Sequence, residues 1–190
     1  MFVKTFIAAA TLCCAGGSAN AASYSATLSG AFENPPNAST ATGFGTLRVL
    51  DASTILVDIT YDGLTTGVGA GHIHCCVGPA GNTGVAIGFS DLVLGGTSGS
   101  YSRTFDLTMA STFTNSFLAS SGGTAALAGA RLLTALDADQ VYFNFHNSAF
   151  PGGEIRGNLS AVPEPASWAL MVVGFGLVGG AVRRRSATFA

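Results

Sequence analysis

The three histidines are the clearest candidates for chemistry in this chain. His72 and His74 are separated by one residue, and His146 lies far along the sequence. Side chains alternate between the two faces of a strand, so His72 and His74 would point the same way while Ile73 points the other. Two imidazoles at this spacing, joined by a third from a distant segment, suit copper or zinc. The sequence therefore predicts either a metal site or a hydrogen-bonded polar network at these residues.

Further polar residues lie close to the histidines in the predicted strands. Asn144 shares a strand face with His146, and Glu154 shares one with Arg156 on the last strand. A short loop joins these two strands, so a hairpin would bring the four side chains together. Buried polar groups need partners, and we expect Arg156 to pair with Glu154 or Glu33.

Cys75 and Cys76 directly follow the histidine pair and are the only cysteines beyond the N-terminal segment. Outside the cytoplasm such thiols tend to oxidise. Neighbouring Cα atoms lie about 3.8 Å apart, less than the roughly 4.4 Å usual for disulfides, so a bond between these residues would be strained and easily reduced. Three states stay open: a vicinal disulfide, free or intermolecular thiols, or Cys76 joining the histidines as a ligand for a soft metal.

Short segments with alternating apolar and polar residues predict an all-β domain between residues 22 and 161. Glycine- and proline-rich turns separate the segments, and two stretches, 111–119 and 124–135, are predicted to be helical. This pattern favours an antiparallel sandwich or Greek-key barrel with a short helical insertion. The predicted strands are 24–28, 43–50, 54–61, 70–76, 85–89, 100–107, 141–146 and 154–159.

The charge of the middle segment excludes nucleic acid as a partner. Residues 22–162 hold four basic and nine acidic residues, a net charge of −5, and no lysine. Binding to nucleic acid requires a basic surface. The segment also lacks a nucleophile elbow, a zinc-protease motif and a phosphate-binding loop. A carboxylate beside an arginine is more often an ion pair than a hydrolytic group, so we expect no enzymatic activity.

Both ends of the chain carry apolar sorting features. Residues 1–21 have Lys4 ahead of an apolar run, followed by Ala19-Asn20-Ala21, which is the pattern of a secretory signal peptide cut by signal peptidase. Residues 166–182 are uncharged and just long enough for a transmembrane helix, and an arginine cluster follows them. The sequence therefore predicts an exported protein that its C-terminal helix holds at the membrane.

The C-terminal segment, residues 162–185, resembles a PEP-CTERM sorting signal. Pro163-Glu164-Pro165, the apolar span and the cluster Arg183-Arg184-Arg185 occur in the order of that signal. The resemblance implies that an exosortase, a membrane protease-transpeptidase, recognises and removes the tail. It also implies a Gram-negative bacterium, often one that makes biofilm or exopolysaccharide. The implied path is transient anchoring in the inner membrane, then the cell surface or the exterior.

Five blocks between residues 22 and 161 resemble the CHRD domain, which occurs in chordin and in microbial secreted proteins. The resemblance implies an immunoglobulin-like β-sandwich with no established enzymatic activity. This sequence departs from the family pattern at Cys75-Cys76 and in the long helical stretch 112–136. The matching blocks are Ala26–Gly30, Glu33–Pro36, Gly71–His74, Tyr142–His146 and Pro151–Gly157.

Two functions follow as hypotheses. In the first, the domain is a non-enzymatic module at the cell surface or in a biofilm matrix, with a matrix polysaccharide or a surface protein as partner and no cofactor. In the second, His72, His74 and His146 bind copper or zinc in the periplasm or outside the cell, with redox chemistry as one use. A copper-zinc superoxide dismutase is not expected, because that family uses more histidines than the three in this chain.

Overall fold

The computed structural model describes residues 22–163 and 171–177. Nine strands form one antiparallel sheet in the order β5-β4-β7-β8-β1-β2-β3-β6, and β9 pairs with β1. The strands are β1 (Ser23–Ser29), β2 (Thr42–Asp51), β3 (Thr54–Asp62), β4 (Val68–Cys75), β5 (Val85–Gly88), β6 (Gly99–Asp106), β7 (Val141–Asn147), β8 (Ile155–Asn158) and β9 (Ser160–Ala161).

Alternation along the strands builds the core on one face of the sheet. On β3, Ile55, Val57, Ile59 and Tyr61 are all buried, as their period of two predicts. Phe143 on β7 is fully buried and belongs to the same hydrophobic core. The opposite face of β4, β7 and β8 is where the polar residues of interest lie.

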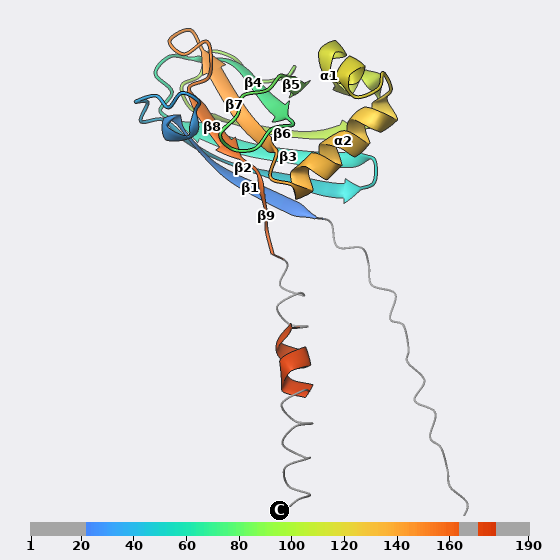
Figure 1. The fold of residues 1–190 in the computed structure, drawn as a ribbon. Helices are drawn as coiled ribbons and strands as arrows, with labels where there is room; N and C mark the ends of the chain where they lie inside the picture. The colour runs from blue at the N-terminus through green and yellow to red at the C-terminus, as the bar shows by residue number, and fades with distance from the viewer. Residues whose placement is uncertain (1–21, 164–170, 178–190) are drawn as a thin grey trace, which may run out of the picture.

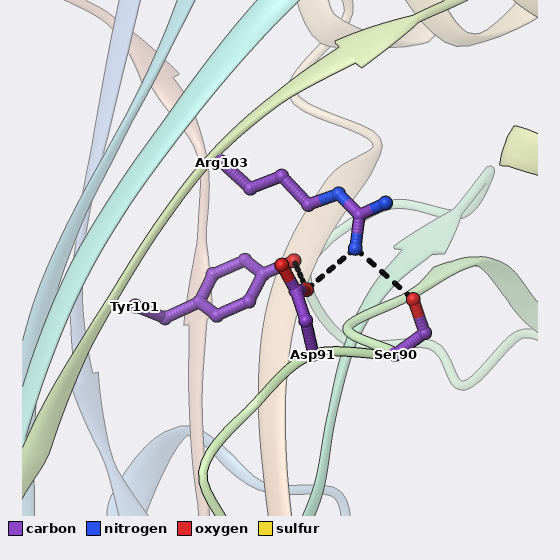
Figure 2. A network of polar contacts seen from close by, with 4 residues as sticks. All are labelled: Ser90, Asp91, Tyr101 and Arg103. Atoms are coloured by element: carbon purple, nitrogen blue, oxygen red, sulfur yellow. Dashed lines mark hydrogen bonds and ion pairs between the residues drawn. The ribbon is translucent and has the colours of Figure 1, made fainter.

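The sheet curls into a half-barrel (Figure 1), and its two edge strands approach each other. Phe89, just after β5, stacks on Tyr101 of β6 with ring centroids 4.3 Å apart. Figure 2 shows the polar contacts beside this stack: Asp91 accepts hydrogen bonds from the Tyr101 hydroxyl (3.0 Å) and from Arg103 (2.6 Å). Arg103 also donates to the Ser90 hydroxyl at 3.1 Å. These contacts link the two edges across the opening of the curl.

Two short α-helices lie between β6 and β7 in the chain: α1 (Asn115–Ser120) and α2 (Ala125–Asp137). There are also two single-turn 3-10 helices: η1 (Gly30–Phe32) precedes β2, and η2 (Ala110–Thr112) precedes α1. Thr124 caps α2 by accepting from the Leu127 amide at 3.3 Å. Thr114 caps α1, which begins later than the predicted helical stretch 111–119 because the preceding residues form η2 instead.

The all-β prediction is confirmed, and each predicted strand overlaps an observed one. The Greek-key sandwich is not confirmed, because the strands form one curled sheet. The predicted signal peptide, residues 1–21, lies outside the described residues. Of the predicted transmembrane helix 166–182, only residues 171–177 are described, and they are helical. None of the helices in the described ranges is long and apolar enough to cross a membrane.

Candidate metal centre

Neighbouring strands β4 and β7 bring the three histidines together. In their antiparallel register His72 lies opposite Asn144, and Ala70 lies opposite His146. Directly opposite residues project to the same face, so all three imidazoles stand on the face turned away from the core. One ring nitrogen from each histidine lies within 4.8 Å of the other two. The three histidines that the sequence predicted to lie together are therefore neighbours, although His146 is distant along the chain.

Main-chain carbonyls orient two of the rings. His74 Nδ1 lies 2.8 Å from the Thr83 carbonyl oxygen, and His146 Nδ1 lies 3.1 Å from that of Pro151. A carbonyl only accepts, so each Nδ1 carries the proton and each Nε2 keeps a free lone pair. Both Nε2 atoms are buried without a hydrogen-bond partner, and so is Nδ1 of His72. Each histidine therefore presents a nitrogen that the described protein atoms leave unsatisfied.

Burial keeps these imidazoles neutral. Burial, reinforced by the charges of His146 and His74, lowers the pKa of His72 to about 4. Burial also lowers the pKa of His74 to about 4, with smaller contributions from His146 and Arg156. The pKa of His146 is lowered as well, again mainly by burial. The neutral imidazole is the form that binds metal, so the cluster is ready to bind at neutral pH.

Arg156 supports the cluster through an aromatic ring. Its guanidinium carbon lies 3.5 Å from the ring centroid of Tyr142, a geometry in which cation and ring attract. The guanidinium also donates to Asn82 Oδ1 (2.9 Å) and to the Pro79 carbonyl (3.1 Å). Both acceptors lie in the β4–β5 loop, which also carries Thr83. The fully buried arginine therefore holds the loop whose carbonyl orients His74.

The polar network pairs differently from the prediction. Arg156 forms no ion pair with Glu33 or Glu154, all three of which lie in the described part of the chain. Glu33 accepts from the Asn144 amide at 3.4 Å. Burial outweighs the effects of Arg156 and Asn144 and raises the pKa of Glu33 to about 7. Gly153 lies against the side chains of Glu33 and Asn144 and has a φ of 131°, which favours glycine. A Cβ at this position would be 2.6 Å from Glu33 Oε1 and from Asn144 Oδ1.

Glu154 is fully buried and connects two loops and the end of β7 rather than pairing with Arg156. It accepts from the Ser39 hydroxyl (2.6 Å), from the Thr65 amide (2.8 Å) and hydroxyl (2.6 Å), and from the Asn147 amide. Burial opposes ionisation, but these hydrogen bonds outweigh it and lower the pKa of Glu154. Glu154 is therefore a structural carboxylate.

Two known sequence families match successive parts of the chain. The sequence model of the CHRD domain matches residues 24–159. The chain belongs to the CHRD domain family. The PEP-CTERM protein-sorting motif matches residues 161–185, directly after the domain, and indicates an exported protein that an exosortase-type enzyme processes. No curated protein and no solved structure matches the chain.

The cysteine pair of this CHRD domain is a disulfide between Cys75 and Cys76. Cys75 is buried in the core, whereas Cys76 is half-buried. Cys76 lines a cleft of about 600 Å³ against α2, together with Arg131 and Thr134. The cluster of candidate metal ligands holds the three histidines and neither cysteine.

Two hollows of the CHRD domain bear on access to its polar residues. One, of about 230 Å³, is lined by His72 together with Gly88 and Ser90, but by neither His74 nor His146. A larger groove, of about 740 Å³, is lined by Glu33 and the half-exposed Phe32, but by none of the histidines.

Sequence reasoning missed the groups that orient the rings. The carbonyls of Thr83 and Pro151 leave no signal in the sequence, because every residue has a carbonyl. Tyr142 could have been found, since it shares a strand face with Asn144 and His146 and lies directly opposite His74.

Proposed function

We propose that this exported CHRD protein acts outside the cytoplasm as a binding module for one copper or zinc ion. One observation carries the proposal: His72, His74 and His146 each bring a ring nitrogen within 4.8 Å of the other two, and each ring has one buried nitrogen without a hydrogen-bond partner. Nitrogens held roughly 2.0–2.1 Å from one tetrahedral zinc ion lie about 3.3 Å apart, so zinc binding would draw the rings closer than the present separations of up to 4.8 Å.

A hydrogen-bonded network explains these nitrogens less well than a metal does. Buried polar atoms in proteins nearly always have partners, and an unsatisfied one costs about 1–3 kcal/mol. Here each of three neighbouring histidines has one such nitrogen, and burial lowers the pKa of all three imidazoles. A cation bound by one nitrogen of each ring would supply the missing partners together. The carbonyls of Thr83 and Pro151 already supply the outer partners that metal-binding histidines usually have.

The ligand set favours copper or zinc over calcium or magnesium. Imidazole suits the former pair, whereas the latter require oxygen ligands, and the cluster contains no carboxylate. Three protein ligands leave one coordination position for water or another small ligand. The proposed role is binding without catalysis.

The route of the protein is part of the same proposal. Residues 166–182 would anchor the chain briefly in the inner membrane, and removal of the tail would then place the domain at the cell surface or in a biofilm matrix. A matrix polysaccharide or a surface protein is the expected neighbour there. Mass spectrometry of the secreted protein tests the route: the tail should be absent in wild-type cells and present in cells that lack the exosortase. A tail kept in both would contradict it.

Thermal unfolding tests the metal proposal. A ligand present at about 100 times its Kd stabilises the folded state by about 2.7 kcal/mol, so Zn²⁺ should raise the Tm and EDTA should reverse the effect. His146→Gln should abolish the shift. Asp58→Asn, which alters an exposed carboxylate on β3, is the control and should keep it. A Tm that responds to neither Zn²⁺ nor Cu²⁺ would contradict the proposal.

A further inference from the structure

The Cys75–Cys76 disulfide presents its two sulfur atoms to different surroundings. Cys75 is 3% exposed and packs in the core, so an external thiol cannot approach it. Cys76 is half-buried and lines the cleft against α2. Ala130 and Ala138 also line this cleft, which has a volume of about 600 Å³, enough for a peptide thiol to enter.

The same cleft contains a positive charge. Arg131 lines it, and within the described part of the chain it donates hydrogen bonds to neutral groups of Ser120 and Ser121 and to no carboxylate. Its guanidinium lies over the Phe117 ring at 5.1 Å. A cation that no carboxylate neutralises attracts thiolate, the reactive form of a thiol. The cleft therefore combines access to one sulfur with a charge that favours the attacking species.

We propose that the Cys75–Cys76 disulfide exchanges with an external dithiol at Cys76, and that its redox state sets the affinity of the three-histidine site for metal. The second half of this inference rests on the proposed metal function, and the first half does not.

The external dithiol is the reductant and supplies the two electrons that opening the disulfide requires. Its thiolate attacks the sulfur of Cys76, a new mixed disulfide forms, and the bond to Cys75 breaks, leaving the electron pair on the Cys75 sulfur, which takes up a proton. The second thiol of the reductant then attacks its own sulfur in the mixed disulfide and releases Cys76. The dithiol becomes a disulfide, and the protein gains two thiols.

A short chain of hydrogen bonds connects this disulfide to the metal ligands. Cys75 directly follows His74 in β4, and its carbonyl accepts from the Thr83 hydroxyl at 3.1 Å. The Cys75 amide donates to the Gly84 carbonyl at 3.5 Å. The Thr83 carbonyl in turn accepts from His74 Nδ1. The group that orients His74 is therefore held in place by the main chain of Cys75, one half of the disulfide.

Reduction should weaken metal binding through this chain. The disulfide restrains the backbone of Cys75, and opening it gives that carbonyl freedom to move away from Thr83. Thr83 then holds the His74 ring less firmly. Loss of an outer hydrogen-bond partner typically lowers metal affinity 10- to 100-fold, so we expect a decrease of about tenfold.

The exchange step is tested with single-cysteine variants of the full chain, with Cys13→Ser and Cys14→Ser as the background. Oxidised glutathione is the probe. Cys75→Ser leaves the thiol of Cys76, which should form the mixed disulfide at least about tenfold faster than the thiol left by Cys76→Ser. Equal rates in the folded protein, or a faster reaction at Cys75, would overturn the exchange step. In urea the two rates should converge, which shows that the fold causes the difference.

The coupling is tested by titrating Zn²⁺ into three forms of the same background: oxidised, reduced with the reductant removed under nitrogen, and Cys75→Ala/Cys76→Ala. We expect the last two to bind about tenfold more weakly than the oxidised form. Equal affinity in all three would overturn the coupling while leaving the metal function intact. Tighter binding by the reduced form alone would overturn it in favour of thiolate ligands. Absence of binding in every form would overturn the proposed function itself.

Discussion

His74 and Tyr142 lie face to face, with ring centroids 4.7 Å apart and 4° between the ring planes. The pair sits directly across β4 and β7, and the same tyrosine ring carries the guanidinium of Arg156. One aromatic ring therefore connects a candidate metal ligand to the buried arginine that holds the β4–β5 loop. This connection explains how a charge can lie fully buried without an opposing ion pair.

The first prediction concerns this ring. Tyr142→Leu should lower the free energy of unfolding by about 2–3 kcal/mol, because it removes the aromatic surface under both His74 and Arg156. Tyr142→Phe keeps the surface and should cost less than about 1 kcal/mol. Urea unfolding of the metal-free variants measures both values. Similar losses in the two variants would mean that the hydroxyl, rather than the stacking, is what matters.

Arg156 and Arg103 give a matched comparison. Arg156→Met leaves the Asn82 and Pro79 acceptors without their donor and should cost about 3 kcal/mol. Arg103 pairs with Asp91 at the surface, where its side chain is 36% exposed, so Arg103→Met should cost about 1 kcal/mol or less. Equilibrium unfolding in urea checks the difference, and equal costs would be inconsistent with the buried role of Arg156.

Glu33 should make stability depend on pH. Its pKa rises from 4.5 to about 7 on folding, so between these values the folded state holds a proton that the unfolded state releases. This contribution to stability is complete below pH 4.5 and is lost as the pH rises through 7. Glu33→Gln cannot ionise, so its stability relative to wild type should increase by about 2 kcal/mol from pH 5 to pH 8. A constant difference between the two proteins would refute the shift.

The histidines should act in the opposite sense. The pKa values of His72 and His74 fall from 6.5 to about 4 on folding. Between these pH values the two imidazoles are protonated in the unfolded state and neutral in the folded state. Their contribution is present above pH 6.5 and is lost as the pH falls toward 4. The metal-free wild type should therefore lose more stability between pH 7 and pH 5 than His72→Gln/His74→Gln. Parallel pH profiles in urea unfolding would contradict this.

Much of the fold was predictable because its signals are local. Alternation along β3 and the capping threonine of α2 need only neighbouring residues. The spacing of His72 and His74 likewise fixed their common face. The curl was not predictable, since it depends on contacts such as that of Asp91 with Arg103, between segments at opposite ends of the sheet order.

The candidate site was predictable in its members and not in its pairings. Glu154 and Arg156 are two residues apart, which suggested an ion pair. The structure instead gives Glu154 four donors from two loops and the end of β7, and gives Arg156 an aromatic ring and a distant loop. Short-range spacing says which face a side chain occupies, whereas its partners come from segments that only the complete fold brings near.

The most direct test of the account is the metal content of the purified protein after equilibration with equal amounts of Cu²⁺ and Zn²⁺ and removal of unbound ions. The site predicts about one copper or zinc ion per chain, and almost none in the folded His72→Asn/His74→Asn/His146→Asn variant. A wild-type protein without metal, or a triple variant that retains the same amount, would contradict the assignment of the histidines as metal ligands.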